Sequence, residues 1–267
     1  MSGVTDLFGP ILQIVMIAMR AGALWMFFPI LGQAGIPTTV RIAGALTLST
    51  ALLRKVGPTL PVWSAAHPPE LAELVGFVLK EFMIGAGMGF TARWIFASVM
   101  ASAHWVGMQM GFSAGGIVDP EFHSSDTSWA ELQNWAAIIL FFGVGGHLLL
   151  IQAMADSYQF NFDLFWDNLL GPTGAQFWIE IGSRFFVWML RLSGPMVVVL
   201  LLLQAALGIL SKFIPQINIW SVSIPVTIGV GIMLFIILSP IYADALGGLF
   251  NVEKESNYLW LKAMGAR

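Results

Sequence analysis

Residues 111–115, GFSAG, satisfy G-x-S-x-G, the pattern around the nucleophile of many serine hydrolases. Such an enzyme places Ser113 on a strand-to-helix turn and brings a histidine and an acid to it from elsewhere in the fold. Histidines are available at His104, His123 and His147. The flanking residues are helical rather than strand-like, and a chain with 28 glycines matches so short a pattern easily by chance. An intramembrane serine protease is therefore an alternative function and not the favoured one.

The same stretch has the composition of a loop that closes a passage. Residues 112–126, FSAGGIVDPEFHSSD, cannot continue a helix well, because paired glycines and an Asp-Pro pair interrupt them. Non-helical backbone at membrane depth is tolerated only where protein or a water cavity covers it. A solvated surface loop is the alternative, but the segment is too apolar for one, and methionines upstream fill irregular gaps readily. We predict a pore plug formed by Met108, Met110, Phe112, Gly115, Gly116, Ile117, Val118 and Phe122.

Small residues that recur every four positions predict close helix packing. One set is Ala103, Gly107, Gly111 and Gly115, and the other is Gly85 and Gly89, flanked at the same spacing by Glu81 and Arg93. Small residues on one helical face let two backbones approach closely in lipid. The two charges at the ends of the second set are less ordinary, and they predict a charged partner helix or an aqueous lumen.

The composition is that of a membrane protein. The chain has 267 residues, of which 57% are hydrophobic and 10% charged, with a mean hydropathy of +0.80. Soluble domains contain about 25% charged residues. The net charge of −3 without a basic cluster excludes nucleic-acid binding, and the absence of cysteine excludes disulfides and thiolate metal sites. We expect no cofactor and no metal, and we expect the first apolar stretch to be retained, because no Lys or Arg precedes it.

The sequence predicts that these residues lie on helices or on the segments that join helices. Apolar blocks cover residues 7–31, 36–53, 71–112, 128–155, 177–210 and 219–250, and none shows the alternation of a strand. A spanning helix needs about 20 residues, so block 71–112 is predicted to form two helices or one bent hairpin. Block 177–210 would be about 50 Å long as one helix, and a kink is predicted at Gly194-Pro195. The predicted fold class is all-α.

Charged residues lie inside the apolar blocks, at Arg20, Arg41, Lys80, Glu81, Arg93, Arg184 and Arg191. Each costs about 2.5–3.5 kcal/mol at a lipid-exposed helix centre, so these helices are expected to face protein or water along much of their length. A polar turn between the last two blocks adds further candidates. The residues predicted to make buried polar or partner contacts are Arg20, Arg41, Glu81, Arg93, Lys212, Gln216 and Asn218.

Taken together, these motifs resemble the FliR/SctT family, the export-gate subunits of flagellar and injectisome type III secretion. The resemblance covers nearly the whole chain, and it rests on the order and spacing of several motifs. They are Arg20 with Pro29, Gly35-Ile36-Pro37 with Arg41, Glu81-x-x-x-Gly85-x-x-x-Gly89-Phe90, Gly107-x-x-x-Gly111, Asp119-Pro120, residues 145–150 (GGHLLL), Asp156-Ser157, residues 207–212 (LGILSK) and residues 215–219 (PQINI). Lys212 replaces the more usual Arg, and Gly194-Pro195 stands where Leu-Pro is common.

The resemblance implies a non-enzymatic, pore-forming subunit of a protein export gate in the bacterial inner membrane. It implies a membrane-associated helical fold with a FliP-like part, residues 1–175 including the plug loop 108–124, fused to a FliQ-like helical hairpin and tail, residues 176–267. The implied partners are FliP and FliQ homologues, FlhB and FlhA homologues, membrane lipids and unfolded exported proteins. Residues 217–221, INIWS, and the Asp-Pro loop favour the flagellar branch. A secondary transporter is the remaining alternative, although no inverted repeat is visible.

Overall fold

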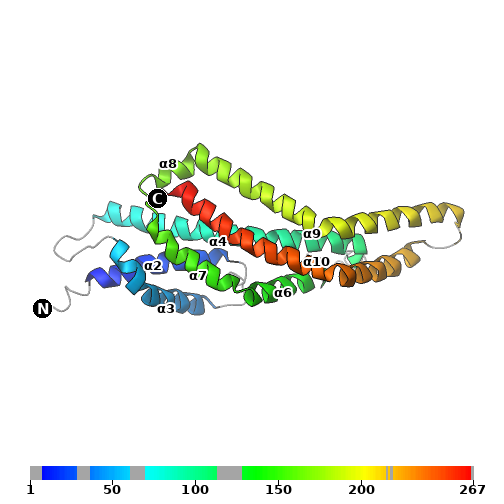
Figure 1. Ribbon diagram of the computed structural model, residues 1–267, viewed down its shortest axis with the longest axis horizontal. Coiled ribbons are helices and arrows are strands. Elements are labelled where there is room, and N and C mark those ends of the chain that lie inside the picture. The colour runs from blue at the N-terminus through cyan, green and yellow to red at the C-terminus, as the bar shows by residue number, and fades with distance from the viewer. Residues whose placement is uncertain are drawn as a thin grey trace. The chain divides into compact units, whose positions relative to one another are not determined.

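The computed structural model describes residues 8–28, 37–60, 70–112, 128–214, 216 and 219–265. The elements in these ranges are all helices (Figure 1). In chain order they are α2 Phe8–Phe27, α3 Thr38–Val56, the 3-10 turn η1 Gly57–Thr59, α4 Leu71–Met110, α6 Ser128–Gly143, α7 Gly146–Asp156, the 3-10 turn η3 Ser157–Gln159, α8 Phe165–Leu170, α9 Pro172–Phe213 and α10 Ile219–Met264. The predicted all-α fold is confirmed, and each apolar block contains a helix or a helix pair.

One prediction about these blocks is wrong. Residues Leu71–Met110 form a single helix of 40 residues and not two helices or a hairpin. The segment contains no proline, and each interior glycine weakens a helix by only about 1 kcal/mol relative to alanine. Packing against neighbouring helices outweighs that penalty, so the glycine-rich centre of α4 stays helical.

The last two helices are long and contain prolines. Helix α9 has 42 residues with Pro195 in its interior, and α10 has 46 residues with Pro225 and Pro240 in its interior. An interior proline removes one helical hydrogen bond and bends the helix. Figure 1 shows α9 changing direction along its length, in keeping with the predicted kink.

The chain divides into two compact units. The first comprises Met1–Trp94, Gly145–Ile181 and Val252–Arg267, and the second comprises Ile95–Val144 and Gly182–Asn251. Helices α4, α9 and α10 each run from one unit into the other along the chain. The predicted division near residue 175 is based on resemblance to two other subunits, whereas these two units are defined by their compactness. The predicted division therefore stays a prediction.

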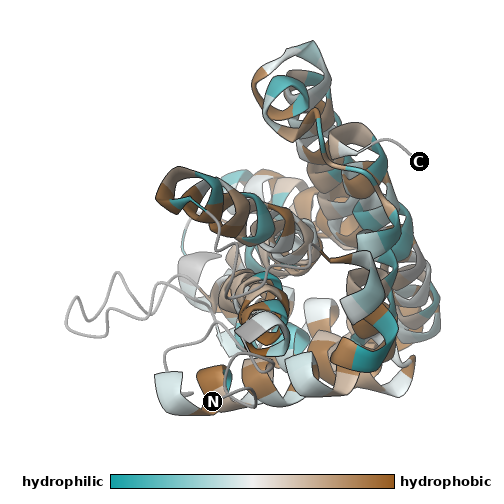
Figure 2. Cartoon of the chain, turned by 90° about the vertical axis from the view of Figure 1, so that its left-hand side faces the viewer, coloured by the Kyte–Doolittle hydropathy of each residue, from teal (hydrophilic) through white to brown (hydrophobic). Residues whose placement is uncertain are grey.

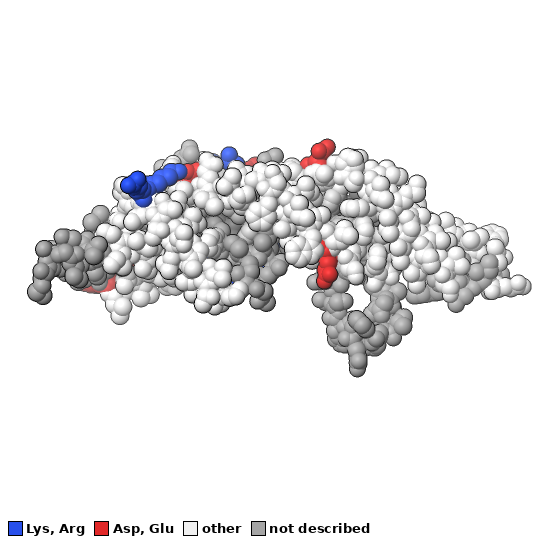
Figure 3. Space-filling view, turned by 90° about the horizontal axis from the view of Figure 1, so that it is seen from below, with Lys and Arg blue, Asp and Glu red and all other residues white. Residues whose placement is uncertain are grey.

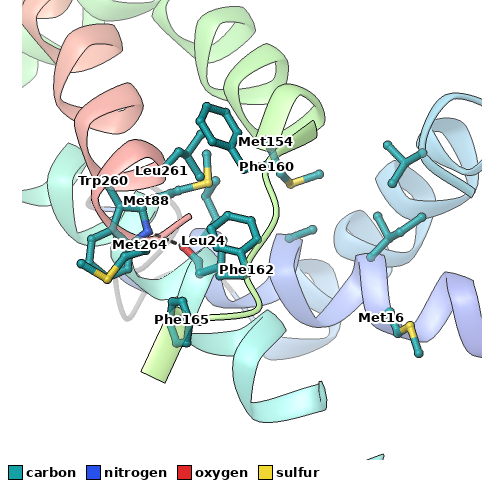
Figure 4. Close-up of a cluster of buried hydrophobic side chains, with 14 of the residues drawn as sticks. Met16, Leu24, Met88, Met154, Phe160, Phe162, Phe165, Trp260, Leu261 and Met264 are labelled. Carbon is teal, nitrogen blue, oxygen red and sulfur yellow. Dashed lines mark hydrogen bonds between the residues drawn. The ribbon is translucent and has the colours of Figure 1, made fainter. Parts of the chain in front are cut away.

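The first unit has a core of aliphatic, methionine and aromatic side chains (Figure 4). Met16 and Leu24 come from α2, Met88 from α4, and Trp260 from the end of α10. The indole Nε1 of Trp260 donates a hydrogen bond to the carbonyl oxygen of Ile84, 3.2 Å away. A side chain at position 87 would collide with this indole, so Gly87 gives α10 its place against α4.

The second unit has its own core. Met110 on α4, Trp129 on α6 and Leu200 on α9 are buried together with Val106, Met196 and Val197. The rings of Phe96, Phe141 and Phe250 form a second aromatic group, with centroids 5.2–5.8 Å apart. This core brings the end of α4 against α6, α9 and α10.

Among the residues that the structure describes, three helices are long and apolar enough to cross a membrane: Gly9–Phe27 in α2, Pro172–Phe213, which is α9, and Ser221–Met264 in α10. Helices α6 and α7 would add a fourth if the pair forms one broken span. Hydrophobic residues are spread along the helices (Figure 2), and many large hydrophobic side chains are exposed. Charged side chains are few on the face in Figure 3. The prediction of a membrane-associated helical protein is confirmed.

Candidate functional site

Arg20 on α2 and Glu81 on α4 are buried charged residues of the first unit, each with 2% of its side chain exposed. The Nε of Arg20 donates to Oε2 of Glu81 at 2.7 Å, and its Nη2 donates to Oε1 of the same carboxylate at 2.9 Å. The third nitrogen, Nη1, donates to Oγ of Ser157 at 2.6 Å. The guanidinium also lies 3.7 Å from the ring centre of Tyr158. We call Arg20, Glu81, Ser157 and Tyr158 the arginine cluster.

The arginine cluster neutralises both buried charges within the chain. A two-point pair between arginine and carboxylate is among the stronger hydrogen-bonded arrangements in proteins. Ser157 in turn donates from Oγ to the carbonyl oxygen of Met154, at 2.6 Å, which fixes the hydroxyl that accepts from Arg20. Arg20 and Glu81 are the two predicted polar residues that the described structure brings together.

The glycines at positions 85 and 89 let α4 approach α2 closely enough to form this cluster. A Cβ atom at Gly85 would collide with the carbonyl oxygen of Arg20, and one at Gly89 would collide with that of Leu24. The predicted role of these two glycines in close helix packing is confirmed. Glu81, one turn before Gly85, is therefore held beside the arginine.

Sequence reasoning named Ser157 only as part of the Asp156-Ser157 motif, and it gave neither Ser157 nor Tyr158 a contact with Arg20. Both lie in η3, directly after α7, and they are more than 130 residues from Arg20 along the chain. A signal was available, because a buried guanidinium has five donors and one carboxylate cannot satisfy them all. An acceptor besides Glu81 was therefore needed.

The other predicted polar residues are not members of the arginine cluster. Arg41 is half-buried on α3, and Arg93 is exposed on α4. Lys212 lies in the last turn of α9 and is exposed, as is Gln216 in the following turn. Asn218 lies outside the described residues. The contacts of these residues with partner chains stay a prediction.

The predicted plug residues are described only up to Phe112. Met108 is 50% exposed, whereas Met110 is buried completely. Phe112 is half-buried, and its ring stacks on Trp129 with centroids 6.3 Å apart. Gly115, Gly116, Ile117, Val118 and Phe122 lie outside the described residues, and so do Ser113 and His123 of the hydrolase pattern.

One part of the small-residue prediction is wrong, because the helical face does not continue to Gly111. Ala103 and Gly107 are buried on the helix, but α4 ends at Met110 and Gly111 has a φ of +93°. That left-handed conformation is typical of the glycine that follows a helix C-terminus. Gly111 is therefore a helix stop and does not continue the packing face.

Two side chains from other helices bond the last carbonyl groups of α4. Gln204 on α9 donates from Nε2 to the carbonyl oxygen of Gln109 at 2.8 Å. Oγ1 of Thr227 on α10 lies 3.0 Å from the carbonyl oxygen of Met110. Sequence reasoning missed both, since neither glutamine nor threonine in an apolar helix carries a motif that identifies its partner.

Within the described part of the chain, no group of three or more His, Asp or Glu side chains is placed to hold a metal ion. His104 lies on α4 in the second unit and His147 on α7 in the first. The polar contacts described above instead join packed helices, pair buried charges and satisfy carbonyl groups at a helix end.

The helices, their apolar surfaces and the buried charge pair define an all-α membrane protein whose internal polar groups organise packing. Residues 11–252 match the sequence model of a family described as bacterial export proteins, family 1. The chain belongs to this family, which is the FliR/SctT family of type III secretion.

Three relatives show the range of the family. The flagellar biosynthetic protein FliR of Escherichia coli (strain K12) is 30% identical over 87% of this chain and 86% of its own length. FliR of Bacillus subtilis (strain 168) is 27% identical over 96% of each chain. The surface presentation of antigens protein SpaR of Salmonella typhimurium is 26% identical over 84% of this chain and 82% of its own.

Proposed function

We propose that this chain is a structural, pore-forming subunit of the type III protein export gate in the bacterial inner membrane. In this role it conducts unfolded proteins across the membrane and catalyses no reaction, so it needs no cofactor. Membership of the family supports the export role, and relatives named for flagellar biosynthesis support the flagellar branch over the injectisome.

The observation that carries the proposal is the uncovered apolar surface of α9 and α10. In the most apolar 18-residue stretch of α9, only 17% of the stretch is buried within the chain, and in that of α10 only 11% is buried. At about 1.5 Å per residue, helices of 42 and 46 residues have path lengths of about 63 and 69 Å, whereas the hydrocarbon core is about 30 Å thick. A helix along the membrane normal would have at most about half of its length in the hydrocarbon core, which favours neighbouring protein as the cover for apolar residues outside it.

Helices of related subunits have the chemistry to cover this surface. We propose that FliP and FliQ homologues pack against it in a hetero-oligomeric gate, with FlhB and FlhA homologues in the same apparatus. Within the chain, residues 1–175 take the FliP-like part and residues 176–267 the FliQ-like part. Arg20 needs no charged group from another subunit, because Glu81 of the same chain already neutralises its charge.

The plug belongs to the same proposal. Residues 108–124 close the lumen of the gate at rest and move aside for an unfolded substrate. An exposed Met108 beside a buried Met110 supports this, because methionine packs well in irregular surroundings and repacks with little strain. Glycine adopts backbone conformations that other residues rarely adopt, so the glycines of the segment favour such a movement.

Co-expression tests the proposal. The chain expressed alone in a bacterial membrane should be degraded or aggregate, and co-expression with its FliP and FliQ homologues should yield one stable complex that contains all three. An unrelated polytopic membrane protein of similar size is the control for the co-expression itself. A stable, monodisperse chain in mild detergent without these subunits would overturn the proposal.

A further inference from the structure

A hollow lies between α9 and α10 within the second unit, beside the interior proline of α9, Pro195. Apolar side chains from both helices form most of its lining. Leu192 and Met196 of the lining are buried, whereas Pro195 and Ile241 are exposed. The hollow therefore has a buried floor and opens onto the surface of the two helices.

The lining favours an apolar occupant over water. The volume of the hollow, about 40 Å³, exceeds the about 10–15 Å³ that one water molecule needs. A buried water also needs two to four polar partners, on the order of what few apolar hollows supply. The hydroxyl of Tyr242, a polar group of the lining, already donates to Oε1 of Gln133 at 2.7 Å. Part of a hydrocarbon chain needs no such partners and would cover the apolar walls.

Arg191 supplies a positive charge at the edge of this hollow. It belongs to the lining, and its guanidinium carbon lies 4.8 Å from the ring centre of Trp188, which does not. The side chain of Arg191 is exposed, and no carboxylate of the described residues forms an ion pair with it. A charge on an apolar helix is costly in lipid unless it is paired or reaches the membrane interface, where tryptophan is also enriched. Arg191 is therefore suited to an anionic partner from outside the chain.

We propose that Arg191 and the hollow bind one glycerophospholipid, and we call them the α9–α10 lipid site. The phosphate accepts hydrogen bonds from the guanidinium of Arg191, which can donate two in parallel, and part of an acyl chain enters the hollow. Basic pockets between membrane helices are suited to lipid head groups for this reason. The inference goes beyond the proposed export function, because it concerns the contact of this chain with the membrane itself.

The binding of phospholipid by the purified protein tests the site. The full chain is extracted in mild detergent with the subunits that accompany it, delipidated, and titrated with dioleoylphosphatidylglycerol, and native mass spectrometry counts the bound lipid. Arg191→Gln should weaken the tightest binding step about tenfold or more, because it removes a charged hydrogen-bond donor. Lys212→Gln removes an exposed charge of the same helix that is not part of the lining, so it is the matched control and should leave the affinity unchanged.

A second variant tests the hollow without changing the charge. Ala245→Leu places a larger side chain in the lining and should also weaken the binding step, because it takes the space of the acyl chain. Ile241→Gln, at the exposed rim, gives the same test if Ala245→Leu does not assemble. Equal binding of dioleoylglycerol, which has no phosphate, would overturn recognition of the phosphate. Displacement of the lipid by excess glycerol 3-phosphate would overturn recognition of the chain.

Two protein partners for Arg191 are distinguished by the same titration. If a carboxylate of a neighbouring subunit binds Arg191, Arg191→Gln should lower the yield of the complex and leave the lipid affinity unchanged. If Asp244, exposed on α10 next to Ala245, binds it instead, Asp244→Asn should have the same effect as Arg191→Gln. Either result would overturn the lipid site. Equal lipid affinity of the unchanged protein and Arg191→Gln at normal yield would mean non-specific lipid only, which also overturns it.

Discussion

Replacing Glu81 with glutamine should destabilise the first unit by about 3–5 kcal/mol, because it leaves a buried guanidinium without its counter-charge. Arg20 and Glu81 are each only 2% exposed, so water cannot replace the lost charge without opening the core. Glutamine keeps one oxygen acceptor and introduces an N–H group that faces the donors of Arg20. One of the two bonds, at 2.7 and 2.9 Å, is therefore lost and becomes a donor-to-donor contact.

The assay is thermal denaturation of the purified complex. For a chain of about 150–250 residues, each 1 kcal/mol lowers the melting temperature by about 2–4 °C, so we expect a decrease on the order of 10 °C. Lys55→Met is the matched control, because Lys55 and Asp156 form an ion pair 3.6 Å apart with side chains 60% and 43% exposed. Exposed pairs contribute less than about 1 kcal/mol, so this control should shift the melting temperature little.

A double replacement tests the reasoning more sharply. Arg20→Met combined with Glu81→Met removes both charges, and apolar replacement of a buried ion pair is often neutral or stabilising. The double variant should therefore be more stable than Glu81→Gln alone. A loss below about 1 kcal/mol in Glu81→Gln, or a double variant as damaged as the sum of its single changes, would refute the account of the arginine cluster.

Three further predictions concern other parts of the chain. Gly85→Ala should destabilise the first unit by about 1–3 kcal/mol in the same denaturation assay, because its Cβ meets the backbone of α2. Gly76→Ala is the control and should be neutral or stabilising, because the space around Gly76 is open. Equal stability of the two variants would contradict the close approach of α4 to α2. Lys212→Glu should reduce motility more than Lys212→Ala, since it reverses a charge at the tip of the α9–α10 hairpin, and wild-type motility in both would exclude a role for the tip. Ser113→Ala should leave export intact at normal assembly, because no nucleophile is needed, and loss of export in that variant would return attention to the protease.

The helices could be predicted from the sequence because their signals are local. Length and hydrophobicity located every apolar block, and Pro195 identified the helix that bends. The continuity of α4 was not predicted, because its 40 residues are about twice the number that a spanning helix needs. The spacing of Gly85 and Gly89 did predict close packing, but not which helix they pack against.

The partners of the buried polar groups could not be predicted, because they are far apart in the chain. Arg20 and Glu81 are separated by 61 residues, and Arg20 and Ser157 by 137. Thr227 and Met110 are separated by 117 residues. The sequence indicated that Arg20 and Glu81 need partners, whereas Thr227 looks like an ordinary residue of an apolar helix. Only the packing of α10 on the end of α4 distinguishes it.

If unfolded substrate passes this subunit, a substrate stalled during export should form a cross-link to it. The chain has no cysteine, so Met108→Cys introduces a single thiol at a position that is 50% exposed. Leu170→Cys, at a position 84% exposed on α8, is the control. With a secreted protein that carries one cysteine and is halted during export, we expect a disulfide to Met108→Cys and none to Leu170→Cys. Equal cross-linking at both positions, or none at Met108→Cys in an active complex, would contradict the proposed pore.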